Sequence, residues 1–240
     1  MRAGQEHDLG AAIAAVRERI RRAALRVGRA PQEVTLIGVT KTVGLETVAE
    51  AIRHGLRDFG ENRVQEFVPK QQAFPGVRWH FIGRLQTNKV NAVVGRAHLI
   101  HSLDRWRLAE YIDGRAQRLG IEVPVLLQVN VAGESAKAGI APAEVADFLG
   151  DVQRLRGLRV EGLMTIAPES DNVEEARPVF RMLRELLEQH RARGYANAPL
   201  RLLSMGMTQD FEVAVEEGAH LVRVGRAIFG PREEEGAAWG

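Results

Sequence analysis

The sequence contains no cysteine, and only four of its 33 cationic side chains are lysines. Without cysteine there are no disulfides, thiol nucleophiles or cysteine-ligated metal sites. No apolar run reaches membrane-spanning length, and the first residues lack the apolar core of a secretion signal. A formal net charge of +2 gives no support to nucleic-acid binding. We therefore expect an intracellular, cytoplasmic protein with no nucleic-acid or membrane partner.

One of the rare lysines stands in an unexpected place. Lys41 closes the run Leu36-Ile37-Gly38-Val39-Thr40, which is apolar and rich in β-branched residues and reads as a buried strand. An ammonium group is costly to remove from water. A chain that otherwise uses arginine for positive charge therefore has a specific reason to place a lysine here.

Short β-type segments alternate with helical patterns along the whole chain. Strands are expected at 34–40, 58–59, 79–82, 98–101, 123–131, 160–165, 202–205 and 221–224. Helices are expected at 8–28, 46–54, 62–72, 88–94, 104–118, 142–153, 173–193, after 209 and from 227. This rhythm predicts an α/β fold, a single (β/α)₈ TIM barrel over residues 1–240 with an extra N-terminal helix. A doubly wound open sheet is the alternative.

The N-terminal helix is predicted to be amphipathic. Its apolar positions are Leu9, Ile13, Val16, Ile20 and Val27, and five arginines occupy the opposite face. We interpret the arginine face as solvated; contact with nucleic acid is the alternative.

Functional groups of such a barrel gather where the strands end. Lys41 ends the first strand, and two glycine-containing turns, 204–208 and 224–230, follow the seventh and eighth. Glycine lets a ligand approach the backbone closely, and these two loops form the usual phosphate site of the fold. The alternative is that Gly206 and Gly225 only serve tight turns.

A lysine beside a phosphate site suggests chemistry on a phosphorylated carbonyl compound. A neutral amine attacks an aldehyde to give a Schiff base, which a guanidinium cannot do. The alternative is an ion-paired lysine at a strand end. His98 and His101 lack further ligands for a metal, so no metal site is expected. Ser204 lacks the surroundings of a hydrolase nucleophile.

Several motifs occur in an order that resembles the pyridoxal phosphate homeostasis protein family (the YggS/PROSC type). The resemblance spans nearly the entire chain and rests on VTLIGVTKT, FGENRVQE, WHFIGRLQTNK, IHSLDR, GLMTIAP, LSMGMTQDFE and VRVGRAIFG. It implies a barrel like the N-terminal domain of alanine racemase, with pyridoxal 5′-phosphate (PLP) as cofactor.

The resemblance also assigns site residues. Lys41 would form the Schiff base with PLP, Asn62 and Met164 would lie near the ring, and Arg223 would face the pyridine nitrogen. The phosphate would be surrounded by Ser204, Met205, Gly206, Gly225 and Arg226. Two positions depart from the family pattern: Arg226 replaces a small hydroxyl residue, and Arg84 stands where proline or histidine is common.

Two functions fit this resemblance. The first is a carrier that holds PLP in intracellular vitamin B6 homeostasis and passes it to apo-enzymes, with little turnover of its own. The second is a PLP-dependent amino-acid racemase. A racemase takes one base, a tyrosine, from a second domain, and we expect no such domain after the eighth strand. Tyr111 and Tyr195 fall away from the strand ends. We favour the carrier, as a monomer. Lys89 and Lys137 stay open as secondary aldehyde sites.

Overall fold

The computed structural model describes residues 8–134 and 137–230. Eight parallel strands form a closed barrel in which each strand pairs with the next in chain order and β8 pairs with β1. The strands are β1 (Thr35–Val39), β2 (Asp58–Glu61), β3 (Arg78–Phe81), β4 (Leu99–Leu103), β5 (Val123–Gln128), β6 (Leu158–Met164), β7 (Leu202–Ser204) and β8 (Leu221–Val224). The predicted (β/α)₈ barrel is confirmed, and the open sheet is wrong.

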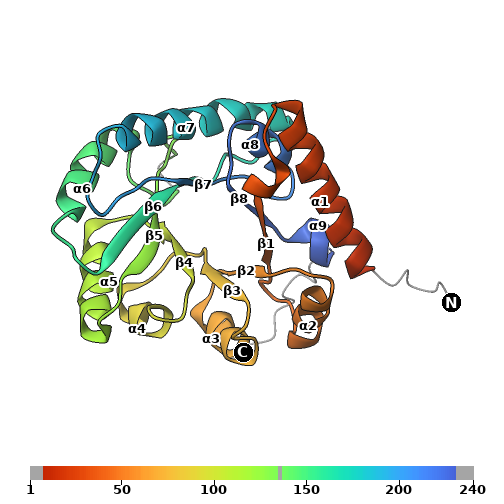
Figure 1. Cartoon of the computed structure of the whole chain (residues 1–240), viewed down its shortest axis with the longest axis horizontal. Helices are drawn as coiled ribbons and strands as arrows, with labels where there is room; N and C mark the ends of the chain where they lie inside the picture. The colour runs from red at the N-terminus through yellow and green to blue at the C-terminus, as the bar shows by residue number, and fades with distance from the viewer. Residues whose placement is uncertain (1–7, 135–136, 231–240) are drawn as a thin grey trace.

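Helices surround the ring of strands (Figure 1). They are α1 (Leu9–Arg26), α2 (Leu45–Arg53), α3 (Val64–Ala73), α4 (Val90–Val93), α5 (Trp106–Leu119), α6 (Val145–Val152), α7 (Arg177–Arg191), α8 (Phe211–Glu216) and α9 (Arg226–Phe229). Short 3₁₀ turns are η1 (Pro31–Glu33), η2 (Thr87–Lys89), η3 (Pro142–Glu144) and η4 (Val173–Ala176). Three predicted helices, 88–94, 142–153 and 173–193, therefore begin as 3₁₀ turns.

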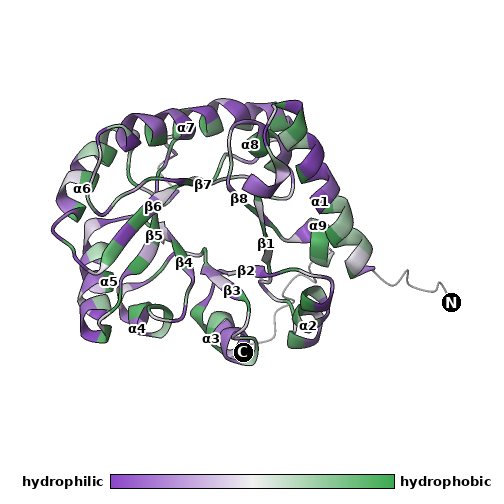
Figure 2. Ribbon diagram, in the orientation of Figure 1, coloured by the Kyte–Doolittle hydropathy of each residue, from purple (hydrophilic) through white to green (hydrophobic). Residues whose placement is uncertain are grey.

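The strands are buried on both faces, which explains their nearly continuous apolar sequences. Residues on the inner face form a small cluster inside the barrel, which consists of Ile37, Leu99, Leu126, Met164 and Leu221. Residues on the outer face join a much larger core between the barrel and the helices. Green and purple segments alternate along the helices in Figure 2, as expected for helices with one face on this core.

Helix α1 packs beside α8 and α9 (Figure 1). The four apolar positions at 9, 13, 16 and 20 are buried as predicted, whereas Val27 is 45% exposed because the helix ends at Arg26. The arginine face is exposed, as predicted, but it is also paired: Arg19 binds Glu212 and Arg26 binds Glu216 on α8. These ion pairs hold α1 on the barrel and favour a structural role for the arginines.

Three strands end two or more residues away from the predicted position, and four others end one residue before it. β2 extends to Glu61, β4 continues two residues past His101, and β5 stops at Gln128 instead of Val131. The longer β4 places His101 inside the barrel instead of at its mouth. Asn130 lies in the turn that follows β5, where its side-chain amide donates to the carbonyl of Glu134.

The predicted single domain extends to both chain ends, but residues 1–7 and 231–240 lie outside the described part. Within residues 8–134 and 137–230, no helix is long and apolar enough to cross a membrane.

Candidate functional site

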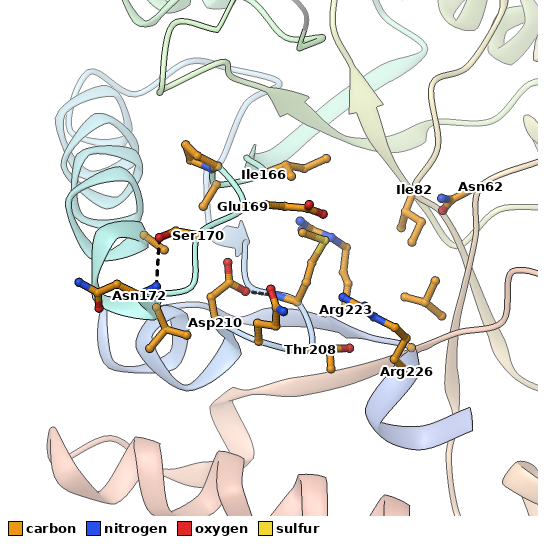
Figure 3. A pocket seen from close by; sticks show the side chains of 18 residues that line it. Asn62, Ile82, Ile166, Glu169, Ser170, Asn172, Thr208, Asp210, Arg223 and Arg226 are labelled. Atoms are coloured by element: carbon orange, nitrogen blue, oxygen red, sulfur yellow. Dashed lines mark hydrogen bonds between the residues drawn. The ribbon is translucent and has the colours of Figure 1, made fainter. Parts of the chain in front are cut away.

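A cavity of about 610 Å³ opens at the carboxyl ends of the strands. Its walls are the segments that follow β2, β3, β6, β7 and β8, together with Val39 at the end of β1. Figure 3 shows Asn62 and Ile82 on one side of this cavity and Ser170 and Asn172 on the other. Ligand sites of (β/α)₈ barrels lie at this face, and the volume suits a small cofactor.

The cavity brings together four of the nine residues predicted for the site. Asn62, Arg223, Gly225 and Arg226 line it. The other five lie behind its walls or at its edge: Lys41, Met164, Ser204, Met205 and Gly206. Met164 belongs to the cluster inside the barrel, and Met205 packs in the outer core, with its amide donating to the carbonyl of Leu221.

Lys41 lies in the turn after β1 and is half-buried. Side chains alternate between the two faces of a strand. Ile37 belongs to the inner cluster and Val39 lines the cavity, so Lys41 continues the inner series. Thr40 belongs to the outer series, where its hydroxyl donates to Glu61 Oε1 at 2.6 Å. Lys41 stands two residues past the end of β1, at the same end of the barrel as the cavity but not among its lining residues.

Arg223 is the buried cation of the site. Its guanidinium donates to Ser204 Oγ at 2.5 Å and to the carbonyl of Thr165 at 2.9 Å. Burial lowers the pKa of Arg223 to about 10, and the charge of Asp210 opposes the shift. Burial raises the pKa of Asp210, although the amide of Met207 donates to its carboxyl. Arg223 therefore stays protonated at neutral pH, in a fixed orientation.

A chain of hydrogen bonds runs from Arg223 through the inside of the barrel to its opposite end. We call it the inner chain; its members are Asp58, His80, His101, Ser204 and Arg223. Ser204 Oγ lies 2.9 Å from His101 Nδ1, His101 Nε2 lies 3.0 Å from His80 Nδ1, and His80 Nε2 lies 3.1 Å from Asp58 Oδ1. At the far end, Arg78 donates twice to the Asp58 carboxylate.

The carboxylate determines the direction of the inner chain when both imidazoles are neutral. Burial alone would raise the pKa of Asp58, but the hydrogen bonds from His80 and Arg78 outweigh it and lower that pKa. His80 then donates from Nε2 to Asp58 and accepts at Nδ1 from His101, and His101 accepts at its own Nδ1 from Ser204. Burial also holds the pKa of His101 well below 6.5, which keeps this ring neutral.

Sequence reasoning missed Asp58, His80 and His101. A signal exists in β3 and β4, because each has a histidine at an inward position in a strand made mostly of apolar residues. The predicted end of the fourth strand at His101 concealed it. A polar residue in the middle of a buried strand requires a partner. Two such residues on neighbouring strands indicate that they bind each other.

Glycine has a different structural explanation in each of the two turns. Gly206 has φ +90, and a Cβ there would lie 2.5 Å from the Cβ of Ala214. A tight turn against α8 therefore explains Gly206 without a ligand. Gly225 lines the cavity and precedes α9, whose first amides lack acceptors within the helix. Arg226 is exposed and also lines the cavity, beside Arg223 in Figure 3.

The remaining basic candidates do not line this cavity, although Lys137 Nζ donates to the carbonyl of Ala167, one of its lining residues, at 3.3 Å. Lys89 and Arg84 line a smaller cavity of about 180 Å³, which Asn62 also lines. The Arg84 side chain is 71% exposed, with its Nε 3.4 Å from Asp104 Oδ2. Lys137 Nζ donates to Glu134 Oε1 at 2.8 Å.

The tyrosines lie far from the strand ends, as predicted. Tyr111 is 45% exposed on α5, and Tyr195 follows α7, where its hydroxyl lies 3.3 Å from His190 Nδ1. Neither lines the large cavity. In the described part of the chain, no three histidine, aspartate or glutamate side chains are arranged to hold a metal ion.

The fold and the site define a barrel of the alanine racemase type. The family model of the alanine racemase N-terminal domain matches residues 12–233. An alanine racemase of Clostridium difficile shares this fold with a TM-score of 0.70 at 14% identity, over 95% of this chain and 58% of that one.

Relatives with higher sequence identity define the family more closely. The chain is 47% identical to the pyridoxal phosphate homeostasis protein of Aquifex aeolicus, over 92% of this chain and 97% of the relative. The structure of PipY from Synechococcus elongatus with PLP bound is 34% identical, with a TM-score of 0.81 over 93% of this chain and all of that one. The chain therefore belongs to the pyridoxal phosphate homeostasis protein family.

Proposed function

We propose that this chain holds PLP as a Schiff base on Lys41 and acts in intracellular PLP homeostasis, without significant turnover of its own. The observation that carries the proposal is the cavity at the strand ends, where Asn62, Arg223, Gly225 and Arg226 converge beside the strand that Lys41 closes. The homologous structure of PipY contains PLP.

The residues fit the cofactor in chemistry as well as position. Bound PLP supplies an aldehyde for a primary amine, a phosphate and a pyridine nitrogen. In this proposal Lys41, two residues past the end of β1, supplies the amine, and Asn62 and Met164 lie near the ring. For the phosphate we propose the turn of Ser204, Met205 and Gly206 together with Gly225 and Arg226.

In this proposal the buried Arg223 faces the pyridine nitrogen of the cofactor. Placed opposite the pyridine nitrogen, a permanent cation disfavours a proton on that nitrogen and so weakens the ring as an electron sink. A racemase also needs a second base across the cavity from Lys41, and neither tyrosine lines that cavity. The racemase therefore remains the second hypothesis from the sequence, without an observation in its favour.

Visible absorption spectra test the proposal. The protein incubated with PLP is expected to be yellow, with an absorption band that Lys41→Ala and Lys41→Arg both abolish while Lys89→Arg leaves it unchanged. A band that survives both Lys41 substitutions would refute the assignment. Deuterium exchange at the α-carbon of alanine in D₂O, if it depended on Lys41, would establish the racemase instead.

The same proposal covers the location, the oligomeric state and the partners of the protein. We propose that it acts in the cytoplasm as a monomer and that PLP-dependent apo-enzymes receive the cofactor from it. Lys89 and Lys137 are not part of the proposed primary site.

A further inference from the structure

A second lysine lies directly behind Lys41, on the outer side of the barrel wall. Lys70 on α3 is only 7% exposed and binds two carboxylates, Glu61 Oε1 at 2.5 Å and Glu66 Oε2 at 3.0 Å. We call these three residues the outer cluster. Glu61 is completely buried at the end of β2, and its Oε2 has no hydrogen-bond partner in the described part of the chain.

The outer cluster binds the backbone on both sides of Lys41. Lys70 Nζ donates to the carbonyl of Thr40 at 2.7 Å, and the amide of Thr42 donates to Glu66 Oε2 at 2.8 Å. The first contact fixes the peptide plane before the Cα of Lys41, and the second fixes the plane after it. Since Lys70 and Glu66 also bind each other, one ion pair fixes both backbone dihedrals of Lys41.

The backbone at this point needs such support. Thr42 has φ 65, in the left-handed region that β-branched residues rarely adopt. Strained conformations of this kind persist only where the surroundings impose them, and they concentrate at functional sites. The amide held by Glu66 belongs to this same residue.

The chemistry of the ammonium group explains the choice of lysine at position 70. An ammonium has three donors, and here they meet three acceptors: the carbonyl of Thr40 and one oxygen each from Glu61 and Glu66. The planar guanidinium fork of arginine does not match three acceptors converging on one point.

The cluster is costly to bury. Burial raises the pKa of Glu61 despite its contacts with Lys70 and Thr40. For Glu66, burial alone would raise the pKa, but the hydrogen bonds from Lys70 and Thr42 lower it overall. A buried ion pair often adds no net stability, because removing its charges from water is costly. The position of the outer cluster beside the site therefore favours a role in fixing the backbone geometry of Lys41.

We infer that Glu66 and Lys70 are positioning residues for Lys41, which hold its backbone so that the amine meets the PLP aldehyde without rearrangement of the turn. The inference rests on the proposed Schiff base at Lys41. Glu61 supports it indirectly, by completing the ligand set of Lys70.

The first test compares substitutions of Glu66, which is accessible enough for the variants to fold. The rate at which excess PLP forms the absorption band is expected to fall about tenfold in Glu66→Ala, the loss of one charge-assisted hydrogen bond, and about threefold in Glu66→Gln, which keeps a neutral acceptor. Glu144 is a matched control because its carboxylate accepts the amide of Ala141 at 2.7 Å, remote from the cavity. Glu144→Ala is expected to leave the rate unchanged.

A second measurement on the full chain needs no cofactor. Hydrogen exchange of the Thr42 amide is expected to be about tenfold faster in Glu66→Ala than in the unsubstituted protein, because its acceptor is gone. Lys70→Met, if it folds, is expected to slow band formation at least as much as Glu66→Ala, and Lys70→Arg is expected not to restore the rate.

The outcomes separate the two proposals. If the unsubstituted protein forms no Lys41-dependent band, the proposed function fails, while the exchange of Thr42 still reports on the cluster. If the band forms and Glu66→Ala matches Glu144→Ala in rate, the positioning inference is wrong. Unchanged exchange at Thr42 in Glu66→Ala would also overturn it.

Discussion

Two buried polar groups flank the candidate site, and they are built differently. The inner chain lies inside the barrel, has a charge at each end and two imidazoles between, and leads to Arg223. The outer cluster lies between the barrel and α3, concentrates two carboxylates around one ammonium, and contacts the backbone of Lys41. The inner chain orients the side chain of Arg223 through a series of hydrogen bonds. The outer cluster instead holds the backbone of Lys41 directly, through charged side chains.

The difference follows from position. An inward residue such as Ser204 meets only other strands, here β8 beside it and β4 across the barrel, so a long link needs intermediates from several strands. An outward residue such as Thr40 meets a helix, and long side chains such as that of Lys70 span the gap alone. The two faces of the barrel wall therefore preorganise the site in different ways: the inner face orients the Arg223 side chain, and the outer face fixes the Lys41 backbone.

The largest effect is expected from breaking the outer cluster. Lys70→Met leaves two carboxylates without their cation and is expected to lower the free energy of unfolding by about 3–5 kcal/mol. Lys137→Met is the control, because its ion pair with Glu134 is partly exposed, with side chains 28% and 43% exposed, and is expected to contribute less than about 1 kcal/mol. Urea unfolding measures both. Equal losses would mean that the outer cluster has no special stability.

Breaking the inner chain is expected to have a smaller effect. His101→Leu leaves Ser204 and His80 each without one partner and is expected to cost about 2 kcal/mol in urea unfolding. His98→Leu is the matched control, since His98 is an exposed histidine that packs edge-on against His80. We expect less than about 0.5 kcal/mol there. A comparable loss in both variants would contradict the account of the inner chain.

The two groups are also expected to differ in pH dependence. The folded pKa of His101 lies well below its unfolded value of 6.5, so the unfolded state binds more protons between those values. Its contribution to stability is therefore complete above pH 6.5 and is lost as the pH falls below it. Between pH 7.5 and 5.5 we expect a loss of about 1 kcal/mol that His101→Gln removes.

Other groups contribute to that pH range in known directions. Burial also lowers the pKa values of His190 and His220, so some acid sensitivity persists in His101→Gln. In the outer cluster, the lowered pKa of Glu66 acts only below its unfolded value of 4.5, outside this range, whereas the raised pKa of Glu61 makes the folded state more stable as the pH falls, opposite in sign to His101. An identical pH profile for His101→Gln and the unsubstituted protein would exclude a neutral buried His101.

The smallest effect is expected at Thr42. Glycine adopts φ 65 without steric cost, which removes strain of about 1–2 kcal/mol but adds about 0.5–1 kcal/mol of chain entropy to the unfolded state. Thr42→Gly is therefore expected to stabilise the protein by about 0.5 kcal/mol in urea unfolding. A destabilisation above 1 kcal/mol would show that the left-handed turn is not strained.

The sequence predicts the barrel well because strand and helix patterns alternate with clear periods. Residues 221–224 match β8 fully, while the fourth strand continues two residues past the predicted end at His101. The difference arises because a buried histidine looks polar in sequence but is satisfied by partners from β3 and β7. Spacing along the chain contains no information on such contacts between strands.

Prediction of the candidate site from sequence has the same limit. Sequence motifs bring Asn62, Arg223, Gly225 and Arg226 to one cavity, and the structure agrees. They do not reveal that Lys70, nine residues after Glu61, turns back to the carbonyl of Thr40. The scarcity of lysine is the signal for it: two of the four lysines lie on opposite faces of one barrel wall.

The most direct test of the central claim is reductive trapping. The protein is incubated with PLP, reduced with borohydride and digested, and its peptides are mapped by mass spectrometry. We predict one phosphopyridoxyl group per chain, on Lys41, with none retained at stoichiometric PLP after Lys41→Arg. Label on Lys89 or Lys137 at equal yield, or no label on any lysine, would contradict the account.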